Sequence, residues 1–326
     1  MGDMLISAGV SCVLTVIIGL WLIPFLRKVK FGQTILDIGP AWHKSKQGTP
    51  TMGGFMFMAA ITVAAVALGW RSMLEGNYVH LFVLLFGWLF GLIGFVDDYN
   101  KVKKKQNKGL SALQKLALQA AVAVAFMSLL RFQGFLTPDV YMIIKGWTVS
   151  LDWVLFLIIG ILLVCGMVNA VNLTDGVDGL CSGVTLPVAV FFAALAHAWA
   201  MPQIAVLAAA LAGGMVGFLC YNHHPAKVFM GDTGSLFLGG MICGLSFAMD
   251  APILMIIVGI IYIIEMFSVI LQVGYFKLTH GKRLFKMAPI HHHFEKSGWS
   301  EVKVTAVFMT ITSVICVLTY LGVAGR

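Results

Sequence analysis

The segment VHLFVLLFGWLFGLIGFVDDYNKVKKK, residues 79–105, joins a long apolar run to an abruptly charged end. The run Val79–Val96 has no Asp, Glu, Lys or Arg and approaches the roughly 20 residues that a helix needs to cross a bilayer. Two adjacent carboxylates, Asp97 and Asp98, and a series of lysines follow it. Ionisable groups at membrane depth are costly and by default indicate function. The segment therefore predicts a membrane-spanning helix that ends in a functional site.

The composition extends this prediction to the whole chain. Hydrophobic residues are 60% and charged residues 11% of the 326, the mean hydropathy is +0.93, and soluble domains have about 45–50% apolar and 25% charged residues. The runs are continuous, unlike the alternating strands of outer-membrane barrels. We predict one domain, residues 1–326, that is an all-α polytopic integral membrane protein with about ten transmembrane helices. The runs are Leu5–Leu26, Met52–Trp70, Val79–Val96, Ala112–Leu130, Leu151–Val171, Val184–Ala198, Gln203–Tyr221, Ser235–Met249, Pro252–Tyr275 and Val304–Leu321, of which the sixth and the eighth are short.

The basic residues are distributed unevenly between the two sides of the membrane. If the loops alternate from an outside N-terminus, 18 of the 22 basic residues lie on one side, which the positive-inside rule makes cytoplasmic. The net charge of +8 then reflects topology, and we predict no nucleic-acid partner. The rich side holds Arg27, Lys28, Lys30, Lys44, Lys46, Lys101, Lys103, Lys104, Lys105, Lys108, Lys115, Lys227, Lys277, Lys282, Arg283, Lys286, Lys296 and Lys303, and the poor side holds Arg71, Arg131, Lys145 and Arg326. The six cysteines form no CxxC pair, which argues against a disulfide framework or a thiolate metal site.

The loop VNLTDGVDGL, residues 171–180, carries three polar side chains at a spacing of three. Asn172, Asp175 and Asp178 would share one face of a helix. Gly176 and Gly179 instead favour a broken backbone that could approach a ligand closely. An ordinary Asn/Asp/Gly loop is the alternative interpretation.

The segment YNHHPAKVFMGDTGSL, residues 221–236, places Asp232 just before an apolar run. This position suits an N-terminal helix cap, a role compatible with catalysis, and the glycines around it, including Gly231, would let backbone amides face an anion. Upstream, polar groups are added by Asn222, His223 and His224. Phe229 offers a stacking surface, although such a residue is more often core or lipid-facing.

The segment KSKQGTPTMGG, residues 44–54, has the composition of a phosphate loop but lacks the GxxxxGK[ST] order, so it is not a Walker A motif. Helix entry and the positive-inside bias also explain it. The segment MAPIHHHFEKSGW, residues 287–299, has three consecutive histidines, which diverge too much to close a tetrahedral zinc site. We expect them to donate to a phosphate. Glu265, in mid-membrane, shares a similar helical face with Gln272. It could line a polar cavity or make a structural hydrogen bond to a neighbouring helix, and we expect the structural bond.

Four motifs together resemble one family. DDY at 97–99, NLTDGVDGL at 172–180, FMGDTGSLFLGG at 229–240 and APIHHHFEKSGW at 288–299 are similar to the phospho-N-acetylmuramoyl-pentapeptide transferases, which belong to the polyprenyl-phosphate N-acetylhexosamine-1-phosphate transferases. The motifs occur in the family's order across almost the whole chain, and none departs from the pattern.

The resemblance implies a reaction, a cofactor and a location. UDP-N-acetylmuramoyl-pentapeptide and undecaprenyl phosphate would give lipid I and UMP, with Mg²⁺ required, in peptidoglycan synthesis for the cell wall. The enzyme would lie in the bacterial cytoplasmic membrane, in contact with membrane lipids, with ten transmembrane helices, both termini outside, a cytoplasmic active-site cleft and a homodimeric state. Mg²⁺ bound by one or two carboxylates and the substrate phosphates is the ordinary arrangement for such chemistry.

The resemblance also implies residue roles. Asp232 is the candidate magnesium ligand, Asp97 the group that deprotonates or orients the lipid phosphate, and Asp98 a supporting metal ligand. Which of the two adjacent aspartates is the base, and whether attack is direct or passes through a phosphoryl-aspartate, stays open. Lys115 and His291 also match positions associated with activity, as do Asn172, Asp175, Asp178 and Asn222. The residues expected near the nucleotide sugar are Lys46, Thr51, Phe229, Gly231, Gln272, His292 and His293. The lysines that follow Asp98 are expected to serve topology and contacts with anionic lipids.

Two other functions fit parts of the sequence. A sister enzyme that transfers N-acetylglucosamine-1-phosphate to the same lipid is the nearer alternative, and the stretch HHHFEKSGW argues against it. A transporter also has many helices with a few polar residues. It predicts charged groups at the midplane of several helices, whereas only Glu265 is clearly central here.

Overall fold

The structure is a computed structural model that describes residues 1–29, 46, 48–103, 109–142 and 146–325. Seven basic residues of the topology count lie outside the described residues, namely Lys30, Lys44, Lys104, Lys105, Lys108, Lys145 and Arg326.

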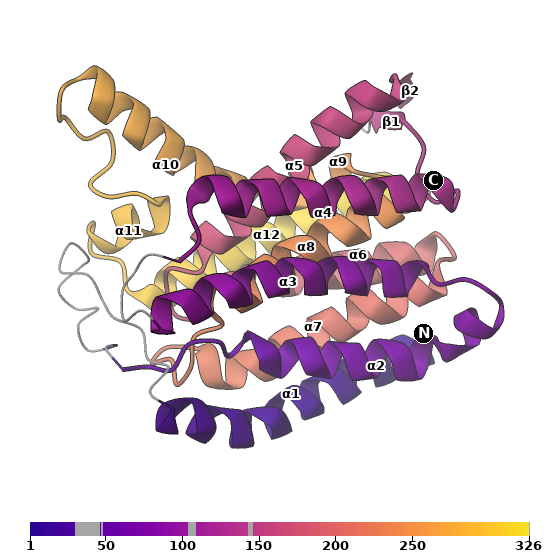
Figure 1. Cartoon of the computed structure of the whole chain (residues 1–326), viewed down its shortest axis with the longest axis horizontal. Coiled ribbons are helices and arrows are strands. Elements are labelled where there is room, and N and C mark those ends of the chain that lie inside the picture. Colours follow the sequence, from indigo (N-terminus) through magenta and orange to yellow (C-terminus); the bar gives the residue numbers. More distant parts are fainter. Residues whose placement is uncertain (30–45, 47, 104–108, 143–145, 326) are drawn as a thin grey trace.

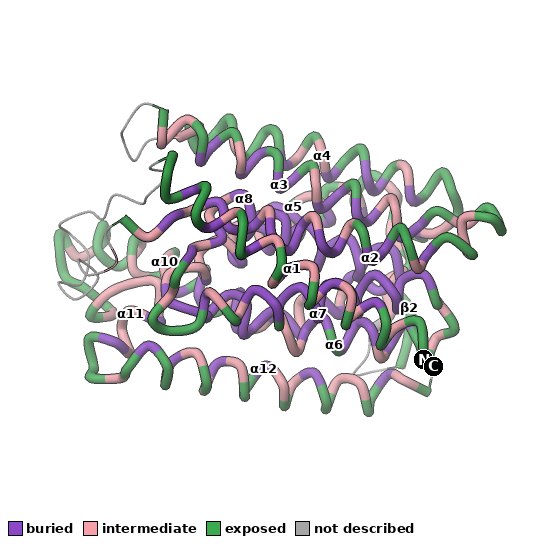
Figure 2. The backbone as a smooth tube through the Cα atoms, turned by 90° about the horizontal axis from the view of Figure 1, so that it is seen from below, coloured by how far each residue is buried: buried purple, intermediate pink, exposed green. Residues whose placement is uncertain are grey.

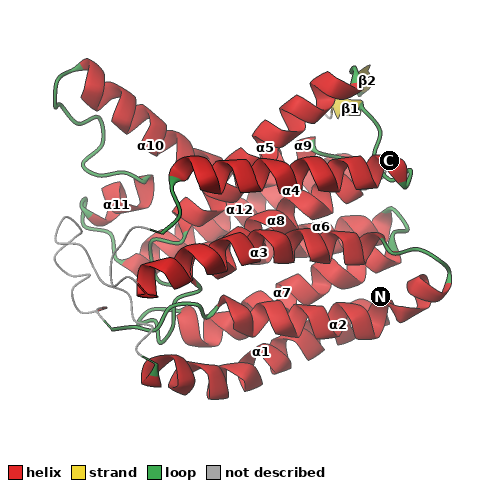
Figure 3. Ribbon diagram, viewed as in Figure 1, coloured by secondary structure: helices red, strands yellow, loops and turns green. Residues whose placement is uncertain are grey.

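The described chain is almost entirely helical (Figures 1 and 3). Nine of its helices are long and apolar enough to cross a membrane, which confirms the all-α polytopic prediction. The eighth predicted run is helix α8, which has 18 residues and is buried from Thr233 onward. The elements are α1 (Gly2–Lys28), α2 (Gly54–Leu74), α3 (Val79–Lys103), α4 (Ala112–Phe132), β1 (Asp139–Met142), β2 (Trp147–Ser150), α5 (Trp153–Thr174), α6 (Leu180–Ala198), α7 (Pro202–Asn222), α8 (Gly231–Ala248), α9 (Ile253–Val258), α10 (Ile260–Leu278), α11 (Ile290–Glu295) and α12 (Glu301–Val323).

The ninth predicted run, Pro252–Tyr275, is not one helix. It divides at Gly259 into the short α9 and the longer α10. The amide of Gly259 still donates to the carbonyl of Met255, at 2.9 Å, and a Cβ at this position would lie 2.4 Å from the same carbonyl oxygen. Beyond the break, α10 diverges from the bundle (Figure 1).

The helices form a core and a periphery. Buried residues concentrate in α6, α7 and α8, whereas α1, α4 and α12 expose much of their length (Figure 2). Large apolar side chains such as Trp21, Phe132 and Leu321 are exposed on these outer helices. In a bilayer these side chains face lipid, because lipid tails are as apolar as the side chains themselves.

The interface between α3 and α8 depends on glycines. A Cβ added to Gly94 would lie 2.1 Å from the carbonyl oxygen of Asp232, and one added to Gly87 would lie 2.7 Å from the sulfur of Met241. Small residues let two membrane helices approach closely. This approach brings the end of α3, with its two aspartates, against the first turn of α8.

The two ends of the bundle differ. One end carries α11, the end of α3 and the loops that follow α5 and α7, while both chain termini lie at the other end (Figures 1 and 2). The hairpin β1–β2, in which Asp139 pairs with Ser150 and Met142 with Trp147, lies near the termini. Sequence analysis did not predict this hairpin. The polar motifs therefore gather at the end opposite to the termini.

Candidate active site

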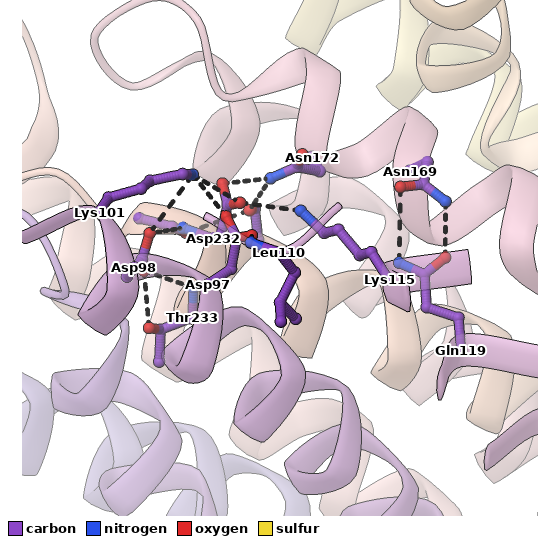
Figure 4. Close-up of polar contacts among 12 residues, drawn as sticks. Asp97, Asp98, Lys101, Leu110, Lys115, Gln119, Asn169, Asn172, Asp232 and Thr233 are labelled. Atoms are coloured by element: carbon purple, nitrogen blue, oxygen red, sulfur yellow. Dashed lines mark hydrogen bonds and ion pairs between the residues drawn. The ribbon is translucent and has the colours of Figure 1, made fainter. Parts of the chain in front are cut away.

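Three carboxylates from two helices meet at this end (Figure 4). Asp97 and Asp98 lie near the end of α3, and Asp232 lies in the first turn of α8. One carboxylate oxygen from each of the three aspartates can be chosen so that all three oxygens lie within 4.8 Å of one another. Asp97 and Asp98 are buried, at 3% and 5% exposure, so their charges need partners within the protein.

Asp98 caps the start of α8. Its carboxylate accepts hydrogen bonds from the amide of Asp232 at 3.2 Å, and from the amide and the hydroxyl of Thr233 at 2.9 and 2.8 Å. The first amides of a helix have no intrahelical acceptor, and an anion there also interacts favourably with the helix dipole. The prediction that Asp232 is the cap was therefore wrong in detail, since α3 supplies the capping carboxylate.

Asp232 is held by groups from three other helices. Its Oδ2 lies 2.8 Å from Lys115 Nζ on α4 and 3.0 Å from Lys101 Nζ on α3. Its Oδ1 accepts a hydrogen bond from the Asn172 amide on α5 at 2.9 Å. Asn172 also donates to Ser235 Oγ at 2.8 Å. Of the predicted residues, Lys115 and Asn172 are thus joined directly to Asp232.

The carboxylate of Asp97 is held in place by the backbone of residues 109 and 110, which passes close to it. The amide of Leu110 donates to its Oδ1 at 2.7 Å. A Cβ on Gly109 would lie 2.3 Å from the same oxygen, so only glycine lets the chain pass this carboxylate so closely. The other oxygen, Oδ2, pairs with Lys101 Nζ at 2.6 Å.

The position of Lys101 differs from the one expected for the lysines that follow Asp98. The sequence assigned the lysines after Asp98 to topology and lipid contact, but Lys101 turns back into the site and pairs with two of its carboxylates. Lys103 lies differently, with its ammonium 5.8 Å from the centroid of the Tyr99 ring.

The carboxylate cluster fits a divalent cation. Its donors are oxygens, which Mg²⁺ prefers, and they come from residues held rigidly by backbone amides. The Lys101 ammonium already lies among them as a cation of the protein itself. The residues that could hold a metal ion here are Asp97, Asp98 and Asp232.

The chain breaks after α5, as Gly176 and Gly179 predicted. The helix ends at Thr174, Asp175 caps its C-terminus, and Gly179 has a φ of +73°. Burial is the main cause that raises the pKa of Asp175 to about 8, and the negative charges of Asp232, Asp98 and Asp178 add to it. Asp175 is therefore largely neutral at pH 7.

A second cluster joins three loops beside this turn. Lys46 Nζ lies 2.7 Å from Asp178 Oδ1 and 2.5 Å from Glu301 Oε2, at the start of α12. Asp178 Oδ2 also lies 3.0 Å from His224 Nδ1 and accepts the amide of Ala226 at 2.9 Å. Lys46 and Asp178 are thus bound to one another. Sequence analysis missed Glu301, whose segment resembles an ordinary helix start, and it named His224 only as one of the polar groups upstream of Asp232.

The predicted catalytic histidine is buried. His291 Nδ1 lies 3.0 Å from Glu265 Oε2, and neither side chain is exposed. A Cβ on Gly176 would lie 2.3 Å from His291 Nε2, so the ring packs beneath the turn after α5. Glu265 thus has the structural hydrogen bond that was expected, and its partner comes from α11.

The other two histidines face different partners. His292 Nδ1 lies 2.6 Å from Glu295 Oε2, while His293 Nδ1 accepts the amide of Lys286 at 3.1 Å. Among the described residues, the groups that could hold a metal ion do not include these two histidines. Gln272 Oε1 accepts the amides of residues 284 and 285, at 3.1 and 2.8 Å, and so holds the same loop.

The remaining predicted residues line the entry to α8. A Cβ on Gly231, whose φ is +71°, would lie 2.6 Å from Asp98 Oδ2 and 2.8 Å from Thr51 Oγ1. Phe229 is partly exposed, and its amide donates to the carbonyl of residue 50 at 2.9 Å. Asn222 is buried and bonded to Ser182 Oγ at 2.9 Å and to the carbonyl of residue 228 at 3.0 Å.

The fold and the site define a class of protein: a polytopic membrane protein with an acidic, lysine-rich site at one end of its helices. The family described as glycosyl transferase family 4 matches residues 80–250. This range includes the carboxylate cluster, Lys115, Asn172 and the turn after α5.

Curated relatives match nearly the whole chain, and three of them carry the name phospho-N-acetylmuramoyl-pentapeptide-transferase. The protein from Clostridium acetobutylicum is 42% identical over 324 residues, 99% of each chain. That from Bacillus cytotoxicus is 44% identical over 324 residues, 98% of each chain. That from Acetivibrio thermocellus is 48% identical over 314 residues, 94% of this chain and 92% of the relative. The chain therefore belongs to the phospho-N-acetylmuramoyl-pentapeptide-transferase family within glycosyl transferase family 4.

Proposed function

We propose that the protein transfers phospho-N-acetylmuramoyl-pentapeptide from its UDP derivative to undecaprenyl phosphate, which gives lipid I and UMP for peptidoglycan synthesis. The observation that carries the proposal is the meeting of Asp97, Asp98 and Asp232 with Lys101 and Lys115 at one end of the helices. A membrane lipid and a soluble nucleotide can meet only at such an edge.

The reaction exchanges one phosphoanhydride bond for another, and the ester bonds to the sugar and to the lipid stay intact. An oxygen of the lipid phosphate attacks the sugar-linked phosphorus of the pyrophosphate, and the bond from that phosphorus to the bridging oxygen breaks, with its electron pair leaving on UMP. Charge on the transferred group must be stabilised, and positioning supplies much of the remaining catalysis. When bound, Mg²⁺ would neutralise the pyrophosphate oxygens and make UMP a better leaving group.

The hydrogen bonds divide the roles of the two adjacent aspartates. Both oxygens of Asp98 are bonded at the start of α8, so Asp98 suits a fixed metal-holding role. Asp97 has one oxygen held by a backbone amide and the other facing a lysine side chain, which can move. This supports Asp97 as the group that orients or deprotonates the lipid phosphate.

Lys115 would neutralise charge on Asp232 and the phosphates. The cluster of Lys46, Asp178 and Glu301 would hold the nucleotide-sugar side of the site together, with Phe229 as a stacking surface for uracil. His291 would act from beneath the turn at Asp175, where it packs against Gly176. His292, His293, Thr51, Gly231 and Gln272 complete the proposed surroundings of the nucleotide sugar.

The membrane arrangement is part of the proposal. The termini lie at one end and the site at the other (Figure 2), and the basic residues favour a cytoplasmic site with both termini outside. The homodimer in this proposal comes from the family resemblance alone. A membrane-impermeant maleimide applied to intact cells should then label Gly2→Cys but not Lys227→Cys. The reverse pattern would contradict this orientation.

The direct test is UMP release by the detergent-purified chain. We expect release only with both UDP-N-acetylmuramoyl-pentapeptide and undecaprenyl phosphate, and its loss with EDTA. Asp232→Asn and Asp97→Asn should abolish turnover while the protein stays folded. A near-normal rate in either variant would remove that residue from the mechanism.

The same assay separates the alternatives. Release from UDP-N-acetylglucosamine instead would indicate the sister transferase. Solute flux in proteoliposomes without UMP release would indicate a transporter. The pairing of Glu265 with His291 argues against the transporter, because the carboxylate that the sequence placed in mid-membrane has a partner at the site end of the protein.

A further inference from the structure

Lys101 occupies the centre of the carboxylate cluster. Its ammonium lies 2.6 Å from Asp97 Oδ2, 3.0 Å from Asp232 Oδ2 and 4.0 Å from Asp98 Oδ1. In Figure 4 it approaches from the side opposite to Lys115. Lys115 pairs only with Asp232 of these three, at 2.8 Å. Lys101 is therefore the cation that the three carboxylates share.

A divalent cation held by the same carboxylates cannot share this position with the ammonium. Like charges a few ångströms apart repel strongly wherever water is partly excluded, and two of these carboxylates are buried. The lysine ammonium is a compact charge on a flexible four-carbon stem. The side chain of Lys101 is 33% exposed, against 16% for Lys115, so it has an open path out of the cluster.

We propose that Lys101 is a built-in counter-ion that competes with the divalent cation for one position. Without the cation, its ammonium neutralises the carboxylates and keeps α3 and α8 together. Binding of the cation displaces the ammonium and releases Asp97 Oδ2. This inference deepens the proposed function and rests on it in one respect: the displaced ammonium, still tethered one turn from Asp97, is then placed to meet the substrate phosphates.

If Lys101 competes with the cation, its removal should have the opposite effect on cation affinity to the removal of a metal ligand or of a residue that supports the site. Loss of a residue that builds a site weakens binding, whereas loss of a competing charge strengthens it. Removal of the Lys101 charge should also destabilise the cation-free protein, because it leaves three carboxylates with less compensation. Added cation should then restore the stability.

The experiment is a titration of the full-length, detergent-purified chain with Mn²⁺ as the probe, followed by electron paramagnetic resonance of the free ion. No substrate is present, so the result does not depend on transferase activity. We expect Lys101→Met to bind Mn²⁺ with a Kd lower by about tenfold or more. Lys103→Met removes the same charge from the same helix outside the cluster and should stay within about twofold of the unaltered chain.

Each outcome decides the question. An unchanged or higher Kd in Lys101→Met, or no Mn²⁺ binding in either protein, overturns the inference. If Lys101→Met is unfolded without cation, recovery of its melting transition in excess Mn²⁺ supports the inference, and failure to recover overturns it. Tighter Mn²⁺ binding by Lys101→Met, together with no UMP release by the unaltered chain, would uphold the competition and reject the transferase, so the two proposals fail separately.

Discussion

Substitution of Gly94 by alanine tests whether the contact between α3 and α8 builds the site. The added Cβ would lie 2.1 Å from the carbonyl oxygen of Asp232 and 2.6 Å from the amide nitrogen of Thr233. Both are backbone atoms, so the two helices must separate by about 1 Å to reach ordinary contact. Overpacking of this kind costs roughly 1–3 kcal/mol, and a misplacement of about 1 Å at a reacting centre can reduce the rate about a hundredfold.

Gly91→Ala is the matched control. Its Cβ would lie 2.6 Å from the terminal methyl of Met58, a flexible side chain that can move aside. We expect UMP release to fall about a hundredfold in Gly94→Ala and no more than a few-fold in Gly91→Ala, with both proteins folded by circular dichroism. A normal rate in Gly94→Ala, or equal losses in both variants, would refute the view that close packing at residue 94 sets the carboxylate geometry.

Three further predictions concern charges around the site. The pKa of Asp175 is raised from 3.8 to about 8, so this group stabilises the fold most at acidic pH and loses that contribution as the pH rises through about 8. Asp175→Asn should therefore lessen the fall in melting temperature between about pH 5 and 8. If the melting temperature of the variant falls with pH as steeply as that of the unaltered chain, the raised pKa of Asp175 is contradicted. Glu301→Gln should raise KM for the nucleotide sugar about tenfold with little change in kcat, because it weakens a charge-assisted bond to Lys46. An unaltered KM would remove Glu301 from the binding side. Glu265→Gln should lower the stability by about 1–3 kcal/mol, because a buried bond to His291 is weakened, and a melting temperature equal to that of the unaltered chain would argue against this.

Much of the fold follows from the sequence because membrane helices can be recognised by their length and hydropathy. The boundaries were least accurate where polar residues enter a helix. The eighth run was predicted to begin at Ser235, but the helix begins at Gly231, because Asp98 supplies acceptors for its first amides. The division of the ninth run at Gly259 was equally hidden, since its residues on both sides are apolar.

The site was predicted in outline but not in its pairings. Aspartates at the ends of apolar runs pointed to one location, and the structure brings Asp97, Asp98 and Asp232 together there. The role of Lys101 was missed because several lysines follow one another and only the helical geometry decides which of them turns back. Glu301 was missed because an acidic residue is common at a helix start, and its partner Lys46 lies far away in the chain.

The glycine-dependent interface between α3 and α8 has a consequence for biogenesis. This helix is short, begins with polar residues and is buried from Thr233 onward, so in the folded protein it packs against other helices rather than against lipid. We expect the nascent chain to retain it in the membrane only through its contacts with α3, which is synthesised much earlier. Because the same contact brings Asp232 to Asp97 and Asp98, a ribosome-bound chain acquires its acidic cluster only when this late helix is in place.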